Sequence, residues 1–190
     1  MKKNLLCAAF LLTSVFLFSQ TEQLDVSGPI HVGMDIGFSN KGYIPLGFHF
    51  SSYKTKFQFG VTFGVPVDKG TKGEYYSSVN WDEYPEDIVG DGEYYTPFTI
   101  DVGYKIYGGL VIGAGIGYAS KTVYRNMYDN LHILGYNGSY HITLNDGGVP
   151  EYKGYVCYYF PSDYNRFMSW FIKGSYSNAM GGGLSIGVTL

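Results

Sequence analysis

The chain has 190 residues, with 13 Lys and Arg against 16 Asp and Glu and a net charge of −3. A nucleic-acid-binding domain concentrates basic residues on one face, so this charge balance argues against nucleic acid as a partner. Gly occurs 27 times and Tyr 20 times, and both counts are high for a soluble globular domain. An excess of both residues fits a narrow β-barrel with girdles of aromatic residues.

The amino-terminal residues have the pattern of a secretory signal peptide. Two lysines precede an apolar run from Leu5 to Phe18, and the small residue Ser19 stands before the expected cleavage point. The run is shorter than the about 20 apolar residues of a membrane-spanning helix, so we expect a cleaved export signal. We therefore predict a signal peptide at 1–19 and one domain at 20–190.

Large apolar residues occupy every second position in several segments of the exported domain. The alternation is clear in residues 30–38, 57–65 and 184–190. A strict period of two predicts β-strands with two chemically different faces. The positions between the apolar residues hold mostly glycine and small polar residues, where a water-facing strand would carry charge. We infer that the bulky side chains face lipid and the small ones face a narrow lumen. A secreted soluble sandwich or barrel is the competing architecture, and its water-facing side would carry almost no charge.

We predict an all-β fold, a closed antiparallel up-and-down transmembrane β-barrel of eight strands. The strands are expected at residues 30–38, 43–51, 57–65, 96–106, 110–121, 152–160, 168–176 and 181–190. Lengths near nine to eleven residues are typical of tilted strands that cross a bilayer. Residues 136–144 also alternate, so they either extend a strand or form an outer hairpin, and ten strands are the alternative count.

The connections after even-numbered strands are short, and two of those after odd-numbered strands are long, whereas those at 39–41 and 177–180 are also short. Short ones are expected at 52–56, 107–109 and 161–167, and long ones at 66–95 and 122–151. Outer-membrane barrels have tight turns on the periplasmic side and longer loops outside the cell. This arrangement therefore predicts that both long connections are extracellular.

Strand parity places several polar side chains inside the lumen. The predicted lumen network comprises His31, Asp35, His49, Asp101, Lys105 and Lys173. Buried charges are costly unless they are paired, so we expect ion pairs that close the lumen. A three-residue hairpin loop at 39–41 would place His31 opposite His49 and Asp35 opposite Pro45. Two imidazoles without a third ligand make a poor metal site, so we expect neither a metal nor another cofactor.

The connection at 66–95 is rich in carboxylates and aromatic side chains. Its candidate surface residues are Asp82, Glu83, Glu86, Asp87, Trp81 and Tyr84. Amphipathic aromatic residues are common in contact surfaces, which favours an extracellular protein or ligand as a partner. The alternative interpretation is a solvated loop that keeps the outer face soluble. The acidic residues do not have the spacing of an EF-hand loop.

The signal peptide, the strand pattern and the terminal strand together resemble a known group of proteins. These are the small outer-membrane β-barrel proteins of Gram-negative bacteria, similar in plan to the OmpA transmembrane domain and OmpX. The resemblance implies location in the outer membrane, surrounding outer-membrane lipid, and insertion by the barrel-insertion machinery acting on residues 183–190. This strand departs from the usual pattern because it ends in Leu190 and not in an aromatic residue.

The sequence favours a non-enzymatic role in envelope structure or in binding an outside partner. No catalytic residue is carried over from the resemblance. A narrow pore for small solutes is the first alternative, and planar-bilayer conductance would reveal it. A lipid-modifying enzyme is the second, because Ser139 and His141 share one strand face. No acidic residue that would orient His141 is identified for such a site.

Overall fold

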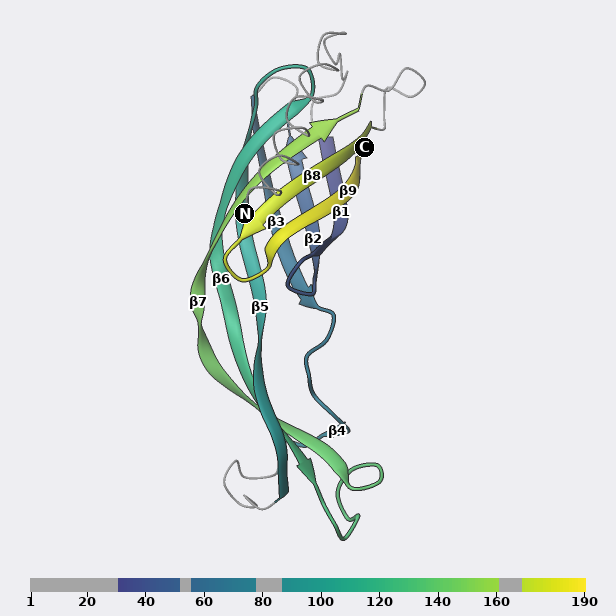
Figure 1. The fold of residues 1–190 in the computed structure, drawn as a ribbon. Coiled ribbons are helices and arrows are strands. Elements are labelled where there is room, and N and C mark those ends of the chain that lie inside the picture. The colour runs from purple at the N-terminus through teal and green to yellow at the C-terminus, as the bar shows by residue number, and fades with distance from the viewer. Residues whose placement is uncertain (1–30, 52–55, 78–86, 161–168) are drawn as a thin grey trace, which may run out of the picture.

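The computed structural model describes residues 31–51, 56–77, 87–160 and 169–190. The predicted signal peptide at 1–19 therefore lies outside the described residues. Among those described, the strands are β1 (His31–Ser39), β2 (Tyr43–Ser51), β3 (Phe57–Pro66), β4 (Glu74–Tyr75), β5 (Ile88–Lys105), β6 (Leu110–Tyr128), β7 (Ser139–Tyr159), β8 (Ser169–Ser177) and β9 (Gly181–Thr189). Figure 1 shows how they are arranged.

Eight of these strands form a closed ring, and β4 lies outside it. Each ring strand pairs antiparallel with the ring strands before and after it in the sequence. Pairing of β1 with β9 closes the ring. The prediction of an eight-stranded up-and-down barrel is confirmed. The ten-strand alternative is wrong, because most of residues 136–144 extend β7.

The two faces of the ring have opposite chemistry. Along β1, Met34, Ile36 and Phe38 are 55, 54 and 72% exposed, whereas Asp35 between them is 5% exposed. The other ring strands repeat this arrangement, with buried Thr, Asp and Lys side chains and exposed Phe, Ile and Val. A soluble protein does not leave so large an apolar surface in water. The fold is that of a transmembrane β-barrel with an apolar outer face and a polar lumen.

The described residues include no helix that is long and apolar enough to cross a membrane.

Three strands continue well beyond the ring. β5, β6 and β7 have 18, 19 and 21 residues, against nine or ten in the other ring strands. Their ends at residues 88–96, 121–128 and 139–149 form a three-stranded sheet, the sheet extension, in the lower half of Figure 1. The prediction of long loops at 66–95 and 122–151 is therefore corrected: large parts of both are strand. The pairing contains two register shifts, at 88–90 and 120–122, where a β-bulge bends the strand and increases its local twist.

The sheet extension has a small hydrophobic core of its own. Met127, Tyr140 and Ile142 are almost fully buried, and Tyr76 and Leu134 pack against them. The segment that leads from β3 crosses the sheet and forms β4, which pairs parallel with β7. A sheet that buries apolar side chains on a covered face holds its shape without the barrel's lumen contacts.

The β1–β2 register differs from the predicted one. His49 lies opposite Gly33, and Asp35 lies opposite Gly47, so His31 does not face His49 across the hairpin. The turn occupies residues 40–42, one residue later than predicted. Gly42 takes a φ of 75°, a left-handed conformation that glycine adopts without strain and that a three-residue hairpin loop needs.

This register also places His49 and Asp35 opposite glycines. A Cβ on Gly33 would lie 2.1 Å from His49 Nε2, and one on Gly47 would lie 2.2 Å from Asp35 Oδ2. Glycine thus provides the space into which the His49 and Asp35 side chains project.

Candidate functional site in the lumen

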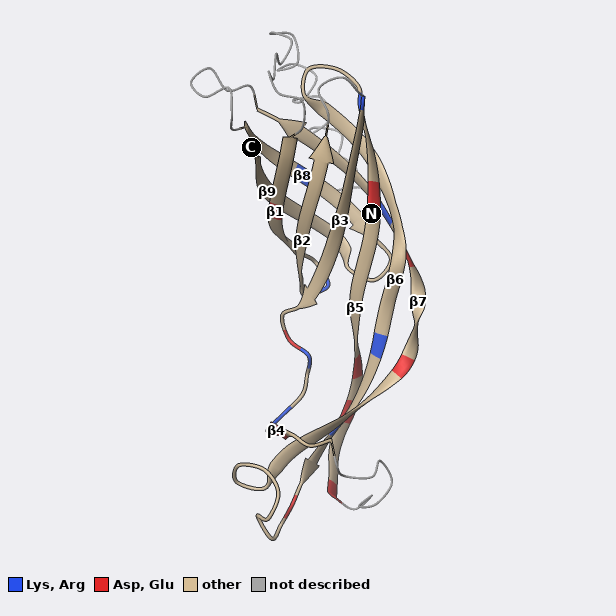
Figure 2. Ribbon diagram, turned by 180° about the vertical axis from the view of Figure 1, so that it is seen from behind, with Lys and Arg blue, Asp and Glu red and all other residues tan. Residues whose placement is uncertain are grey.

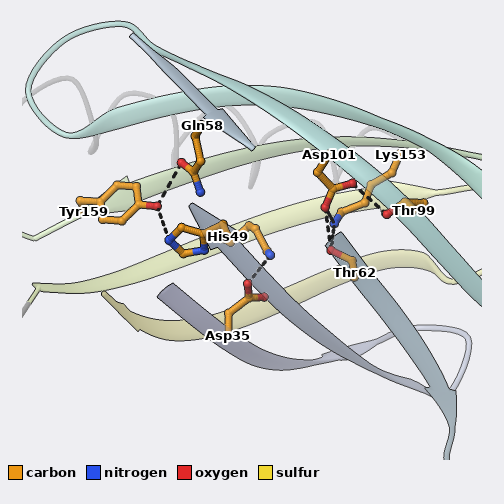
Figure 3. A network of polar contacts seen from close by, with 9 residues as sticks. Asp35, His49, Gln58, Thr62, Thr99, Asp101, Lys153 and Tyr159 are labelled. Carbon is orange, nitrogen blue, oxygen red and sulfur yellow. Dashed lines mark hydrogen bonds and ion pairs between the residues drawn. The ribbon is translucent and has the colours of Figure 1, made fainter. Parts of the chain in front are cut away.

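Asp101 and Lys153 form an ion pair in the middle of the lumen. Lys153 Nζ, on β7, lies 2.7 Å from Asp101 Oδ2, on β5. The hydroxyl of Thr62 donates to the same oxygen at 2.7 Å, and the hydroxyl of Thr99 donates to Oδ1 at 2.8 Å. All four side chains are buried, as Figure 3 shows from close by. Both carboxylate oxygens are therefore satisfied, which offsets part of the cost of burying the charge.

A second ion pair joins β8 to β1. Lys173 Nζ lies 2.5 Å from Asp35 Oδ2, and both residues are buried. Each lysine therefore reaches a carboxylate two strands away along the ring, from β7 to β5 and from β8 to β1. These two ion pairs contain two cations and two anions, so their net charge is zero.

A hydrogen-bonded group lies between these ion pairs and the end of the barrel that carries His31 and Leu190. The Tyr159 hydroxyl donates to Gln58 Oε1 at 3.1 Å and lies 3.0 Å from His49 Nε2. Because the hydroxyl has one proton and donates it to Gln58, its contact with His49 requires a proton on Nε2. The His49 ring also packs edge-on against Phe171, with centroids 5.0 Å apart.

The opposite mouth of the lumen is covered by the β8–β9 turn. Met180 is 4% exposed, and a Cβ on Gly64 would lie 2.7 Å from its sulfur. Gly64 belongs to β3, across the ring from this turn, so the Met180 side chain spans the mouth. Glu151 supports the turn, because its Oε2 accepts the Ala179 backbone N–H at 3.0 Å.

The structure brings together four of the six residues predicted for the lumen network. Asp35, His49, Asp101 and Lys173 lie in the contacts described above. His31 and Lys105 lie apart from them, where they line a cavity at the end of the barrel that carries His31 and Leu190.

The predicted lumen network left out other residues that face the lumen. They are Gln58, Thr62, Thr99, Glu151, Lys153 and Tyr159. The signal for Lys153 was present, because strand parity in 152–160 places it on the same face as Tyr155 and Cys157. Within the described residues, no group of three His, Cys, Asp or Glu side chains is close enough to hold a metal ion.

Most of the predicted acidic loop surface cannot be placed. Trp81, Asp82, Glu83, Tyr84 and Glu86 lie outside the described residues. Asp87 is described and lies immediately before β5, at the far end of the sheet extension. Figure 2 shows further charged residues along the extension and the segment that leads to β4.

His141, considered for a lipid-modifying site, contacts the backbone. Its Nδ1 lies 3.1 Å from the Lys72 carbonyl oxygen and 3.2 Å from that of Gly73. These contacts are those of a proton donor that fastens the segment before β4 to β7.

The β6–β7 turn at the tip of the sheet extension is organised by one carboxylate. Asp129 Oδ1 accepts the Leu131 N–H at 2.8 Å, and Oδ2 accepts those of Ile133 and Leu134 at 2.7 and 2.9 Å. These bonds, with Leu134 the strongest contributor, lower the pKa of Asp129. The turn holds Leu131, Ile133 and Tyr136 at 75 to 78% exposure. We call these three side chains the apolar tip.

Lys121 links two strands at the base of the extension. Its Nζ lies 2.9 Å from Glu93 on β5 and 3.2 Å from Asp146 on β7. The hydrogen bond with Lys121 lowers the pKa of Glu93, and the bonds to both carboxylates raise the pKa of Lys121.

No family model matches the sequence, and no curated protein matches it. A de novo designed transmembrane β-barrel is similar to it, with a TM-score of 0.36 and 9% identity over 84% of this chain and 92% of that chain. The N-terminal β-barrel domain of Pseudomonas aeruginosa OprF is also similar, with a TM-score of 0.31 and 14% identity over 85% of this chain and 96% of that chain. The fold assignment rests on the strand ring and its apolar outer face.

Proposed function

We propose that this protein is a non-conducting outer-membrane β-barrel whose sheet extension binds a macromolecular partner outside the cell. The sheet extension carries the proposal, because it has its own buried core and a structured apolar tip. The barrel anchors this surface in the membrane. The role is one of display and binding, without catalysis.

The direction of the strands supports the orientation. Both described ends of the chain, at His31 and Leu190, lie at the same end of the barrel, and the sheet extension projects from the other end. Barrels of bacterial outer membranes keep their short turns in the periplasm and their longer segments outside. In that orientation the apolar tip is the part of the described chain farthest from the membrane.

The contacts inside the ring support a closed lumen. An eight-stranded ring has an interior that side chains fill. Here two ion pairs, the His49 group and Met180 occupy successive levels of it. Conduction would require these buried ion pairs and hydrogen bonds to separate, which is costly in a low-dielectric interior. A narrow pore is therefore the weaker proposal.

The apolar tip has the properties of a binding surface. Large apolar side chains that anchor an interface lose little conformational freedom if they are already held in place. Asp129 holds the backbone of the turn with hydrogen bonds to the N–H groups of Leu131, Ile133 and Leu134, so the exposed side chains project from an ordered turn. A turn that served only solubility would have no need of exposed Leu and Ile.

A triple variant tests this proposal. Leu131→Ser, Ile133→Ser and Tyr136→Ser are combined, and Val67→Ser serves as the control because Val67 is 63% exposed outside the tip. Proteoliposomes carrying each variant are titrated against arrays of extracellular proteins and glycans. We expect specific binding that the triple variant loses and the control keeps. Binding that the triple variant retains, or no binding by the unmodified protein, would overturn the proposal.

A further inference from the structure

The apolar tip lies well away from the lipid that surrounds the barrel. Exposed apolar side chains on the ring strands face that lipid. The sheet extension carries the tip about ten residues of β7 beyond the ring, roughly 30 Å at the rise of a β-strand. In Figure 1 the turn between β6 and β7 lies at the opposite end of the molecule from His31 and Leu190. The exposure of the tip therefore needs an explanation other than the barrel's own bilayer.

The tip turn carries no formal charge. Residues 130–138 contain no Asp, Glu, Lys or Arg. Asp129, which precedes them, directs its carboxylate to backbone N–H groups of the turn. Charged side chains are the groups that most oppose transfer into lipid, so this cost is small for the turn. Protein interfaces are commonly enriched in Arg, and the turn has none. Its composition therefore favours a lipid surface.

The backbone of the tip turn is also suited to a poorly hydrated environment. Five consecutive N–H groups, from Leu131 to Gly135, donate hydrogen bonds within the protein. Asp129 accepts four of them, three through its carboxylate and that of His132 through its backbone oxygen at 3.1 Å. The Tyr76 hydroxyl accepts the fifth, from Gly135, at 3.1 Å. An N–H group that loses water without gaining a partner opposes insertion of backbone into lipid, and these five groups already have partners.

The turn is fastened to the rest of the sheet extension by its inner side. Leu134 and Tyr76 pack against the small core of the extension. The Tyr76 ring lies edge-on to Tyr140, with centroids 5.7 Å apart. Leu134 is thus directed inward, while the three side chains of the apolar tip are directed outward. A turn that is already ordered loses little conformational freedom when its exposed side chains become buried.

We propose that the apolar tip inserts into the interface of a second lipid bilayer that faces the outer membrane. Leu131 and Ile133 enter the boundary of the acyl chains. The phenol of Tyr136 lies at the level of the headgroups, where amphipathic aromatic rings are enriched. This inference goes beyond the proposed function, which concerns a macromolecular partner, and shares with it the tip and the outward orientation of the sheet extension.

Binding to vesicles tests the inference without depending on that orientation. The folded protein is embedded in nanodiscs, which leave both ends of the barrel accessible, and is sedimented with sucrose-loaded vesicles of phosphatidylcholine. Empty nanodiscs give the background. We expect the protein to sediment with the vesicles. Adding phosphatidylglycerol should not strengthen binding, because the turn offers no Lys or Arg to anionic headgroups. No binding to phosphatidylcholine, or binding only to anionic vesicles, would overturn the inference.

Two matched variants locate the contact with lipid. Ile133→Ser should weaken vesicle binding about tenfold, because it removes one large apolar side chain that lipid buries. Leu144→Ser removes a leucine that is 51% exposed on β7, in the sheet extension but outside the tip, and should bind as the unmodified protein does. Gel mobility before and after boiling checks that both variants are folded barrels. Equal binding by the two variants would contradict insertion of the tip.

A third variant tests the role of the backbone. Asp129→Ala keeps every side chain of the apolar tip but removes the carboxylate that accepts three N–H groups. It should bind phosphatidylcholine vesicles more weakly than the unmodified protein, and unchanged binding would contradict the inference. The vesicle result also separates this inference from the proposed function. Tip-dependent binding to an extracellular protein, without binding to vesicles, would support the proposed function and overturn the insertion into lipid.

Discussion

Gly115 on β6 lies directly opposite Asp101 on β5, and a Cβ at position 115 would lie 2.0 Å from Asp101 Oδ1. The absence of a side chain at one position therefore makes room for the carboxylate that pairs with Lys153. The same relation links Gly47 to Asp35 on the other side of the ring. On the inner face, each of these two aspartates therefore lies opposite a glycine that leaves room for its carboxylate.

Gly115→Ala should destabilise the barrel, because the methyl group displaces a buried and fully hydrogen-bonded carboxylate. We expect a loss of about 1–3 kcal/mol in the free energy of unfolding. Gly154→Ala is the matched control, because a Cβ there meets nothing within 4 Å. Urea titrations followed by gel mobility give both values. Equal unfolding midpoints for the two variants would contradict the tight fit at Gly115.

Lys153→Met should cost more, because it leaves the buried Asp101 carboxylate without its cation. Removal of one partner from a buried pair costs about 3–5 kcal/mol. Adding Asp101→Asn removes the stranded charge and should restore a large part of that loss. The four urea unfolding free energies of a double-mutant cycle test this. A double variant no more stable than Lys153→Met would show that the loss does not come from an unpaired Asp101 charge.

Cys157 should be inaccessible in the folded protein. It is 1% exposed and packs with Val111, Tyr155 and Phe171 inside the ring. A water-soluble maleimide should label it only after unfolding, whereas the exposed control Leu131→Cys should react at once in the native state. Rapid labelling of native Cys157, measured by mass spectrometry, would indicate a lumen open to solutes.

The tip turn should lose its order in acid. The Asp129 carboxylate accepts three backbone hydrogen bonds, so its folded-state pKa is below the ordinary value of about 3.9. Its contribution is complete above that ordinary value and is lost as the pH falls through the lowered one. The amide resonances of Leu131, Ile133 and Leu134 should shift together below about pH 4. In Asp129→Ala, these shifts should already be present at neutral pH, and an unchanged spectrum would refute the role of Asp129.

The sequence predicts the membrane-spanning strands well, because lipid imposes strict alternation on them. The predicted strand at 43–51 coincides with β2, and the one at 30–38 ends one residue before the end of β1. Outside the membrane this constraint is absent. Residues 88–95 were therefore interpreted as loop, because their glycines and acids do not alternate with apolar residues, although they continue β5.

The lumen contacts were predicted only in part. Parity identified Asp35 and Lys173 as inward residues, but their pairing depends on the closure of β1 onto β9, which no local pattern encodes. The hairpin register depended on whether Ser39 or Gly42 occupies the turn, and the left-handed conformation of Gly42 decides it. A displacement of one residue in this turn changes every cross-strand partner in the hairpin.

The state of the protein in membranes tests the central claim most directly. The mature protein is extracted from outer membranes in detergent and run on a gel with and without boiling. A closed transmembrane barrel should stay compact without boiling and migrate more slowly after it. Recovery of the protein in the soluble fraction, with no mobility shift on boiling, would contradict the assignment of the apolar outer face to lipid.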